Sequence, residues 1–420
     1  MNPDPPASDK RHGLRFAGAI LATGVLAGLV GRLCVLALHL VEAIAWNRRS
    51  GALLDAVTQA SPLHRLLVLL LAGVIAGVSW TLMFRRDRGL VSVGAAVEGT
   101  PMPLARTLWH ALTQILVVGL GASIGREVAP REISASLASW VGRRIGLSAE
   151  DLRILVACGA GAGLAAVYSI PLSGAVYTLE ILLVALRSRT VAPAFAVSAI
   201  AVLVSTGWER PAPFYTVPRL EPSASLVCWA LIMGPLIGWL GVLFRRTAHS
   251  FESARPRDRR LLATLPLGFG LVGLVAIGVP SVLGNGQASA QTQFDAEWLG
   301  GAGLGLALLV LAAKAFTTLL TIRVGGWGGT LTPAVALGAG LGAVTGLAWS
   351  WAWPGTSIAA FVFIGAAVFL GASMKAPFTG LVLVLEFTQQ GAQILVPTAL
   401  AIGAAVAATA WAERSAPDAS

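Results

Sequence analysis

The sequence predicts an all-α polytopic membrane protein made of two related halves, and three observations support this expectation. Of the 420 residues, 56% are hydrophobic and only 12% are charged, about half the charged share of a typical soluble domain. Apolar runs long enough to span a bilayer recur along most of the chain. In addition, a segment near the middle of the chain is repeated near its end. These features leave no room for a sizeable aqueous domain.

The apolar runs define the expected domain organisation. Four of them have the length and apolarity of spanning helices: 16–31, 65–84, 227–244 and 261–279. Such runs recur from residue 16 to residue 412, so 16–412 is expected to form a single transmembrane domain. The polar, proline-rich start, 1–15, is expected to be a disordered cytoplasmic tail, and 413–420 a short C-terminal tail.

The net charge of +10 is explained by membrane topology. Basic residues gather in short segments beside the apolar runs, for example Lys10 with Arg11, Arg143 with Arg144, and Arg245 with Arg246. The positive-inside rule places these segments, and the N-terminus, on the cytoplasmic side. No nucleic-acid partner is expected, because no basic run comes with an aqueous domain. The three cysteines and five histidines show no ligand spacing, so no metal and no cofactor are expected.

An internal repeat divides the transmembrane domain into halves of about 16–207 and 222–412. SIPLSGAVYTLEILL (169–183) and KAPFTGLVLVLEFTQ (375–389) share a proline, a glycine and a glutamate at a constant offset of 206: Pro171, Gly174 and Glu180 match Pro377, Gly380 and Glu386. Two related halves interrupted by glycine and proline are typical of inverted-topology repeats. In such folds, broken or re-entrant helices meet at a site inside the membrane.

Three glycine-containing turns each precede a helical run: 89–99, 125–132 and 325–333. A helix N-terminus presents unpaired N–H groups and the positive end of the helix dipole. Several such ends converging inside a membrane would form an anion site without any full positive charge. A site of this kind would also let the anion leave again. The turn GREVAPRE (125–132) stands out because it carries four charged side chains next to apolar sequence.

These segments resemble the CLC family of chloride channels and chloride/proton exchangers over nearly the whole chain, from about residue 16 to residue 412. GREVAPRE resembles the family's Gly-Arg/Lys-Glu-Gly-Pro stretch, and GGTLTP (328–333) is similar to its Gly-x-Phe-x-Pro filter segment. AAVYSIPLSGAVYTLE and ASMKAPFTGLVLVLE match further family segments. The resemblance implies the CLC-type fold, with its two inverted-topology repeats, and chloride as the transported ion.

The resemblance also implies roles for individual residues. Glu127 takes the position of the gating glutamate, which competes with the anion when it is ionised and withdraws or takes up a proton to let the anion pass. Anion binding is assigned to six positions: Ser92, Gly125, Arg126, Glu127, Thr330 and Leu331. Ser92 lies in Val-Ser-Val-Gly-Ala where the family has Gly-Ser-Gly-Ile-Pro, so an ordinary buried serine remains an alternative. A structural ion pair between Arg126 and Glu127 is the alternative to the gate.

Two departures from the family bear on mechanism. Exchangers carry a second glutamate as inner proton acceptor where this chain has Ile181, directly after Glu180. The family's inner-gate tyrosine is also missing, because the C-terminal stretch is WAERSAPDAS (411–420). Both departures favour channel-like flow of chloride. A chloride/proton antiporter with a different proton route is the alternative.

Function classes other than anion transport are less well supported by the sequence. His39 and His110 lie in apolar surroundings without a motif partner, so neither an intramembrane hydrolase nor any other enzyme is expected. A carrier for other solutes would be expected to show several intramembrane acids, and only Glu127 is convincing. The expected partners are chloride, other halides, protons in an exchanger, the lipid bilayer and a second copy of the chain in a homodimer. The expected location is a bacterial inner membrane.

Overall fold

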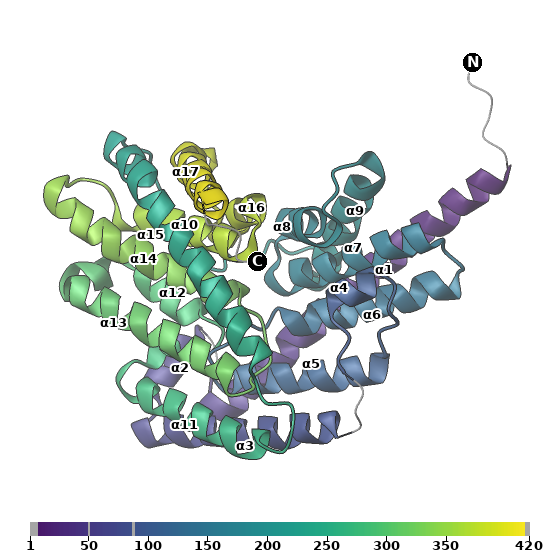
Figure 1. Cartoon of the computed structure of the whole chain (residues 1–420), viewed down its shortest axis with the longest axis horizontal. Coiled ribbons are helices and arrows are strands. Elements are labelled where there is room, and N and C mark those ends of the chain that lie inside the picture. The colour runs from purple at the N-terminus through teal and green to yellow at the C-terminus, as the bar shows by residue number, and fades with distance from the viewer. Residues whose placement is uncertain (1–6, 49–50, 86–88, 416–420) are drawn as a thin grey trace. The chain divides into compact units, whose positions relative to one another are not determined.

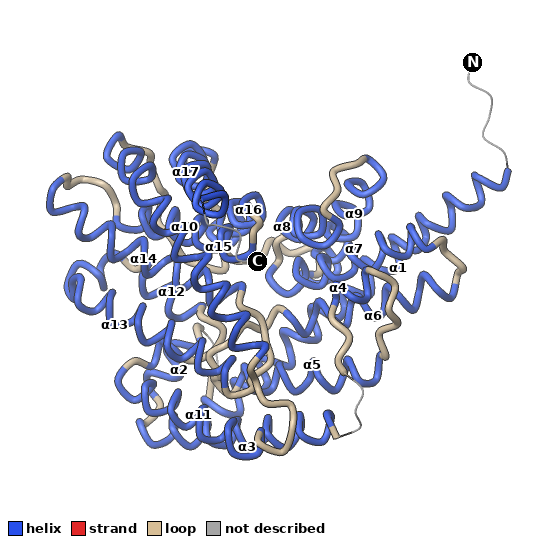
Figure 2. Tube along the Cα trace, in the orientation of Figure 1, coloured by secondary structure: helices blue, strands red, loops and turns tan. Residues whose placement is uncertain are grey.

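The computed structural model describes residues 7–48, 51–85 and 89–415. This part of the chain forms helices joined by loops, and no β-strand (Figure 2). Nine of its helices are long and apolar enough to cross a membrane, and several shorter helices lie between them. The all-α polytopic fold class predicted from the sequence is therefore confirmed.

In chain order the α-helices are α1 (Ala7–Trp46), α2 (Leu53–Gln59), α3 (Pro62–Phe84), α4 (Val93–Val97), α5 (Leu104–Gly119), α6 (Val128–Arg144), α7 (Ala149–Tyr168), α8 (Pro171–Tyr177), α9 (Ser188–Thr206), α10 (Ala224–Ser253), α11 (Leu261–Gly278), α12 (Gln287–Phe294), α13 (Ala296–Arg323), α14 (Leu331–Ala352), α15 (Ile358–Met374), α16 (Pro377–Thr388) and α17 (Leu395–Ser415) (Figure 1). A π-helix, η1 (Thr178–Leu183), continues α8, and two short 3-10 turns are η2 (Pro280–Val282) and η3 (Ala392–Ile394).

The chain divides into two compact units. Unit 1 comprises Met1–Ala37, Arg88–Leu112 and Glu127–Ala212, and unit 2 comprises Leu38–Asp87, Thr113–Arg126 and Pro213–Ser420. Helices α1 and α5 each contribute residues to both units, and the peptide bond between Arg126 and Glu127 is one of the junctions. The division into sequence halves of about 16–207 and 222–412 stays a prediction.

In unit 1, α7 packs against α6 and α9. The contact with α6 is close because glycines on α7 leave room for its backbone. A Cβ atom added at Gly163 would lie 2.4 Å from the carbonyl oxygen of Pro130, and one at Gly159 would lie 2.9 Å from that of Ser134. Small residues at such positions let membrane helices approach closely, which is how this glycine-rich sequence builds a compact helical core.

In unit 2, α3 packs against α11, α14 against α15, and α10 against α17 (Figure 1). Here too the close approach depends on glycine. A Cβ atom at Gly365 on α15 would lie 2.5 Å from the carbonyl oxygen of Gly338 on α14. This packing holds the first turns of α14 in a buried setting.

Helix α1 begins at Ala7, so residues 7–15 are helical where the sequence suggests a disordered tail. Residues 1–6 and 416–420 lie outside the described residues. Helix α17 continues to Ser415, three residues into the expected C-terminal tail. In α1 the physical reason is tertiary, because Nε2 of His12 lies 2.7 Å from Oδ2 of Asp151 on α7. Local composition does not reveal such a contact.

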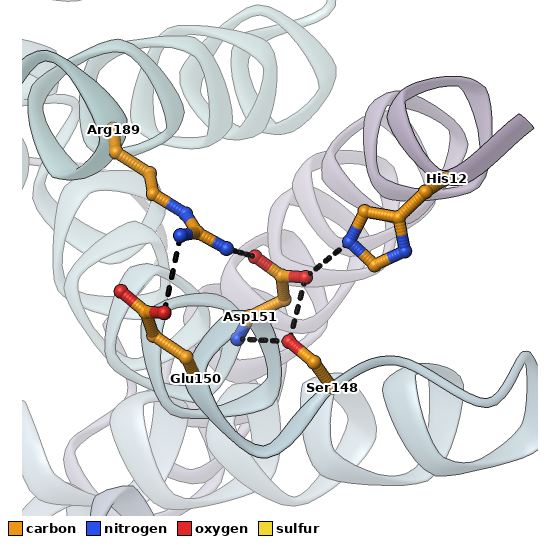
Figure 3. A network of polar contacts seen from close by, with 5 residues as sticks. All are labelled: His12, Ser148, Glu150, Asp151 and Arg189. Atoms are coloured by element: carbon orange, nitrogen blue, oxygen red, sulfur yellow. Dashed lines mark hydrogen bonds and ion pairs between the residues drawn. The ribbon is translucent and has the colours of Figure 1, made fainter. Parts of the chain in front are cut away.

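The polar network around Asp151 fixes the starts of α7 and α9 in unit 1 (Figure 3). Arg189 donates a hydrogen bond to Oδ1 of Asp151 at 2.9 Å and pairs with Glu150 at 3.1 Å. The Ser148 hydroxyl donates to Oδ2 of Asp151 at 2.8 Å and caps α7 by accepting from the backbone N–H of Asp151 at 3.1 Å. Because Asp151 is buried, these donors offset its desolvation.

Candidate functional site

Two of the glycine turns singled out from the sequence are joined by their backbones in unit 2. The N–H of Gly125 donates to the carbonyl oxygen of Gly329 at 2.7 Å, and the N–H of Gly329 donates to that of Gly125 at 3.0 Å. The approach needs glycine, because a Cβ atom at Gly328 would lie 2.8 Å from Cγ2 of Ile124. The chain continues from Gly125 into α6 and from Gly329 into α14. The bridge thus fixes the turns from which both helices start.

Glu127 stands at the start of α6, as its N-cap residue, and is fully buried in unit 1. The hydroxyl of Tyr168, the last residue of α7, donates to Oε2 of Glu127 at 3.2 Å. The first N–H groups of α6 and the positive end of its dipole lie at the same place. The carboxylate therefore occupies the kind of environment that also binds a small anion.

The start of α14 in unit 2 offers the same backbone donors without a carboxylate. Thr330 is the N-cap residue, and its side chain makes no capping hydrogen bond. Leu331 is the first helical residue and is buried. Helix α14 contains no charged residue along its 22 positions. Its first N–H groups are thus suited to an anion, and the dipole favours negative charge there.

A buried lysine, Lys314, makes a hydrogen bond to the segment that precedes Gly125. Lys314 on α13 is 1% exposed, and its Nζ donates to Oγ of Ser123 at 2.9 Å and to the carbonyl oxygens of Val282 and Gly284 at 2.9 and 3.0 Å. All three acceptors are neutral. Lys314 therefore ties the segment before Gly125 to the segment that follows α11.

The third glycine turn also carries an aromatic residue that faces basic side chains. The guanidinium carbon of Arg255 lies 3.2 Å from the ring centroid of Trp327, and that of Arg257 lies 6.0 Å away. Burial lowers the pKa of Arg255 to about 10. Because this value is still well above neutral, Arg255 stays charged between pH 5 and 8. If the rate of anion transport changes between pH 5 and 8, the change must therefore come from the titration of other groups.

Ser92 and Ile181 belong to unit 1. Ser92 caps the short helix α4, where its Oγ accepts from the N–H of Ala95 at 3.2 Å. Ile181 lies in the π-helix η1, next to Glu180. Gly125, Arg126, Thr330 and Leu331 belong to unit 2. Within it, the guanidinium of Arg126 lies over the ring of Phe214, 5.7 Å from its centroid.

The π-helix marks a difference between the two repeated segments. Both begin after a residue in the left-handed conformation, Ser169 and Lys375, which are 206 positions apart. Both also end at such a residue, Val184 and Gln389, which are only 205 positions apart. The first segment therefore has one extra residue. A π-helical turn accommodates one additional residue and is frequent at functional sites, and this one contains Ile181.

Sequence reasoning missed several polar contacts of the site. Two of the residues involved could have been found in the sequence, because Tyr168 and Lys314 each place a polar group in an apolar run. His110 has no motif partner in the sequence, but its Nδ1 lies 2.9 Å from Oε2 of Glu132 in the structure. The two residues are 22 positions apart, so no local motif reveals the pair.

Fold and site together describe a membrane protein with buried, backbone-lined helix starts suited to an anion. The sequence matches the voltage-gated chloride channel family over residues 72–410. The chain belongs to this family, as the resemblance to CLC proteins predicted, and it is a multi-pass integral membrane protein that serves chloride transport.

Relatives with both transport modes are similar to this chain. It is 29% identical over 392 residues to the voltage-gated ClC-type chloride channel ClcB of Escherichia coli, covering 89% of this chain and 91% of that protein. It is also 29% identical over 407 residues to the H(+)/Cl(-) exchange transporter ClcA of Vibrio cholerae, covering 92% of this chain and 84% of that protein. A slow cyanobacterial Cl⁻/H⁺ antiporter has the same fold, with a TM-score of 0.78 at 20% identity over 95% of this chain and 97% of that one.

Proposed function

We propose that the protein moves chloride through a pathway that Glu127 gates. The observation that carries the proposal is the placement of Glu127, a fully buried carboxylate at the first turn of α6 held by the Tyr168 hydroxyl. When ionised, it competes with chloride for the donors of this helix start. When protonated, it loses the charge that holds it there, and the anion takes its place.

The proposed pathway uses the helix start at Thr330 and Leu331 as the anion-binding counterpart of Glu127. Chloride is the favoured anion because the candidate position Ser92 carries a hydroxyl rather than a nitrate-favouring proline. Gly125 and Arg126 complete the proposed binding residues. The role is transport, so no catalytic residue is assigned.

The proposed mode of transport is supported by the isoleucine at position 181. An isoleucine can neither bind nor release a proton, so this position favours channel-like flow. Chloride/proton exchange is the alternative, and it requires a proton acceptor elsewhere in the membrane interior. The names of the relatives are compatible with either mode, since they include a channel and an exchange transporter.

The proposed assembly is a homodimer in a lipid bilayer with one chloride pathway in each subunit. The proposed location is the inner membrane of a bacterium, with the N-terminus in the cytoplasm. The basic residues Arg143 and Arg144 at the end of α6 support this orientation.

The gate is tested by Glu127→Gln, which keeps the size of the side chain and removes its charge. Chloride efflux from proteoliposomes is measured between about pH 4.5 and 7.5, a range in which carboxylates titrate. The wild type is expected to conduct several-fold faster at the acid end, because protonation frees the site. The variant is expected to be fast at every pH. The matched control, Glu98→Gln, removes an exposed carboxylate of the same unit and should behave as the wild type.

An unchanged pH response of Glu127→Gln would refute the gate. Absence of any halide flux in the wild type would refute the chloride pathway itself.

A further inference from the structure

A histidine and a glutamate form a buried pair in unit 1 that the proposed gate does not use. Nδ1 of His110, on α5, lies 2.9 Å from Oε2 of Glu132, on α6. The side chain of His110 is 1% exposed and that of Glu132 is 13% exposed. Titratable side chains at membrane depth are costly and are usually functional. The pair therefore calls for an explanation beyond packing.

A structural link between α6 and its neighbours does not need charged groups. One turn further along α6, the hydroxyl of Ser136 donates to the carbonyl oxygen of Met102, just before α5, at 3.0 Å. That neutral contact ties the same two parts of the chain together. An imidazole and a carboxylate add something that the hydroxyl cannot provide, which is the capacity to take up and release a proton.

The pair also lies at a useful place along α6. Glu132 follows Glu127 by five residues, which corresponds to about 7.5 Å along a helix axis. The displacement is toward the helix end that carries Arg143 and Arg144. In the proposed orientation this is the cytoplasmic end, so the pair lies on the cytoplasmic side of Glu127. A second proton acceptor is needed on this side if protons are to reach the gate from the cytoplasm.

Charged and titratable groups surround the gate, and one of them, Arg131, also interacts with the pair. Nε of Arg131 donates to the backbone carbonyl oxygen of Glu127 at 3.1 Å, and its NH1 group donates to the Tyr177 hydroxyl on α8 at 2.5 Å. Tyr168 on α7 donates to the Glu127 carboxylate. The guanidinium charge interacts with both Glu127 and Glu132. Because Arg131 interacts with both carboxylates, a proton that binds at one of them changes the electrostatic environment of the other.

We propose that His110 and Glu132 form a proton-binding site that takes the role for which Ile181 is unsuited. The pair takes up one proton from the cytoplasmic side, on the imidazole or on the carboxylate. It passes that proton to the Glu127 carboxylate, which becomes neutral as the pair returns to its starting state. No other reactant is consumed. The inference rests on the proposed Glu127-gated chloride pathway. As the mode of transport it takes the alternative named above, proton-coupled exchange, in place of channel-like flow.

The experiment records chloride efflux and external pH at the same time in proteoliposomes that contain the full-length protein. In the wild type, chloride leaving the vesicles is expected to drive protons inward, so that the external medium becomes alkaline. Glu132→Gln and His110→Gln each keep a hydrogen-bonding side chain, but the glutamine cannot take up a proton. Both are expected to lose proton movement by at least about tenfold while chloride flux stays within about threefold of the wild type.

The matched control is Glu180→Gln, a carboxylate of the same unit next to Ile181 in the π-helix. It should keep proton coupling. Coupling that survives both pair variants, or that is lost only in Glu180→Gln, overturns the proposal. If both pair variants lose chloride flux together with proton movement, the pair is structural and the proposal is again overturned.

The wild type separates this inference from the proposed function. Chloride flux without proton movement would overturn the proton-binding site and leave the Glu127-gated pathway standing. Absence of chloride flux would instead refute the pathway.

Discussion

The starts of α6 and α14, which are the two proposed anion-binding helix starts, differ in where their charged side chains lie. Helix α6 carries its charges itself: Glu127 is its N-cap residue, and Arg131 and Glu132 follow in its first two turns. Helix α14 carries none, and its first residues are the neutral Thr330 and Leu331. The nearby basic side chain in unit 2 belongs to another helix: it is Lys314 on α13, which donates to Ser123.

Because of this difference, we expect the start of α6 to respond to pH and the start of α14 to bind the anion at every pH. A helix start that contains a carboxylate brings its own competitor for the anion, so protonation can open and close it. A neutral helix start has backbone donors that remain available at every pH. We therefore expect substitutions in unit 2 to alter protein stability and anion binding. Substitutions of Glu127, Arg131 or Glu132 should instead alter how transport responds to pH.

Replacing Lys314 by methionine should have the largest effect on the α14 side of the comparison. The change leaves the carbonyl oxygens of Val282 and Gly284 without the Nζ donor, while the Ser123 hydroxyl keeps its contact with Thr317. Each unsatisfied buried acceptor costs about 1–3 kcal/mol. The unfolding temperature in detergent should fall clearly, and chloride flux at neutral pH should drop at least about tenfold.

Lys375→Met is the matched control, because Lys375 is exposed, and it should change neither quantity. A Lys314→Met protein with normal stability and chloride flux would show that Lys314 is dispensable for both.

Gly328→Ala should have an intermediate effect, because it strains the bridge between the two turns. The added Cβ atom would lie 2.8 Å from Cγ2 of Ile124 and 2.9 Å from the carbonyl oxygen of Gly125. Overpacking of this kind typically costs about 1–3 kcal/mol. Thermal unfolding and chloride efflux measure the result, with Gly305→Ala as control, since a Cβ atom there meets nothing within 4 Å. Equal behaviour of the two variants would contradict the importance of the bridge.

Thr330→Ala should have the smallest effect. The Thr330 side chain makes no capping hydrogen bond, so the anion is expected to rely on backbone N–H groups at this helix start. Chloride affinity, measured by calorimetry on the purified protein, should stay within about twofold of the wild type. A tenfold loss would assign the binding to the hydroxyl and reduce the contrast with α6.

The candidate site was only partly predictable from the sequence. Gly125, Glu127 and Thr330 were singled out because glycine, charge and proline in an apolar chain are local signals. The Gly125–Gly329 bridge joins turns about 200 residues apart, and the His110–Glu132 pair joins two helices. Contacts of this kind depend on how helices pack, which no short stretch of sequence specifies.

The repeated segments give a finer example. The matching proline, glycine and glutamate predicted two related segments with an offset of 206. The π-helix that shortens the offset to 205 at their ends was not foreseen. Its extra residue lies among apolar side chains that are similar in both segments, so hydropathy does not reveal it.

The sequence by itself determined the membrane class, the spanning segments and the family, and it singled out Glu127 as the proposed gate position. Length, apolarity and short motifs are properties of neighbouring residues. Only the tertiary structure decided that α1 begins at Ala7, that Lys314 is held by neutral oxygens, and that His110 meets Glu132. Burying a polar group requires a partner. Packing selects that partner from distant parts of the chain.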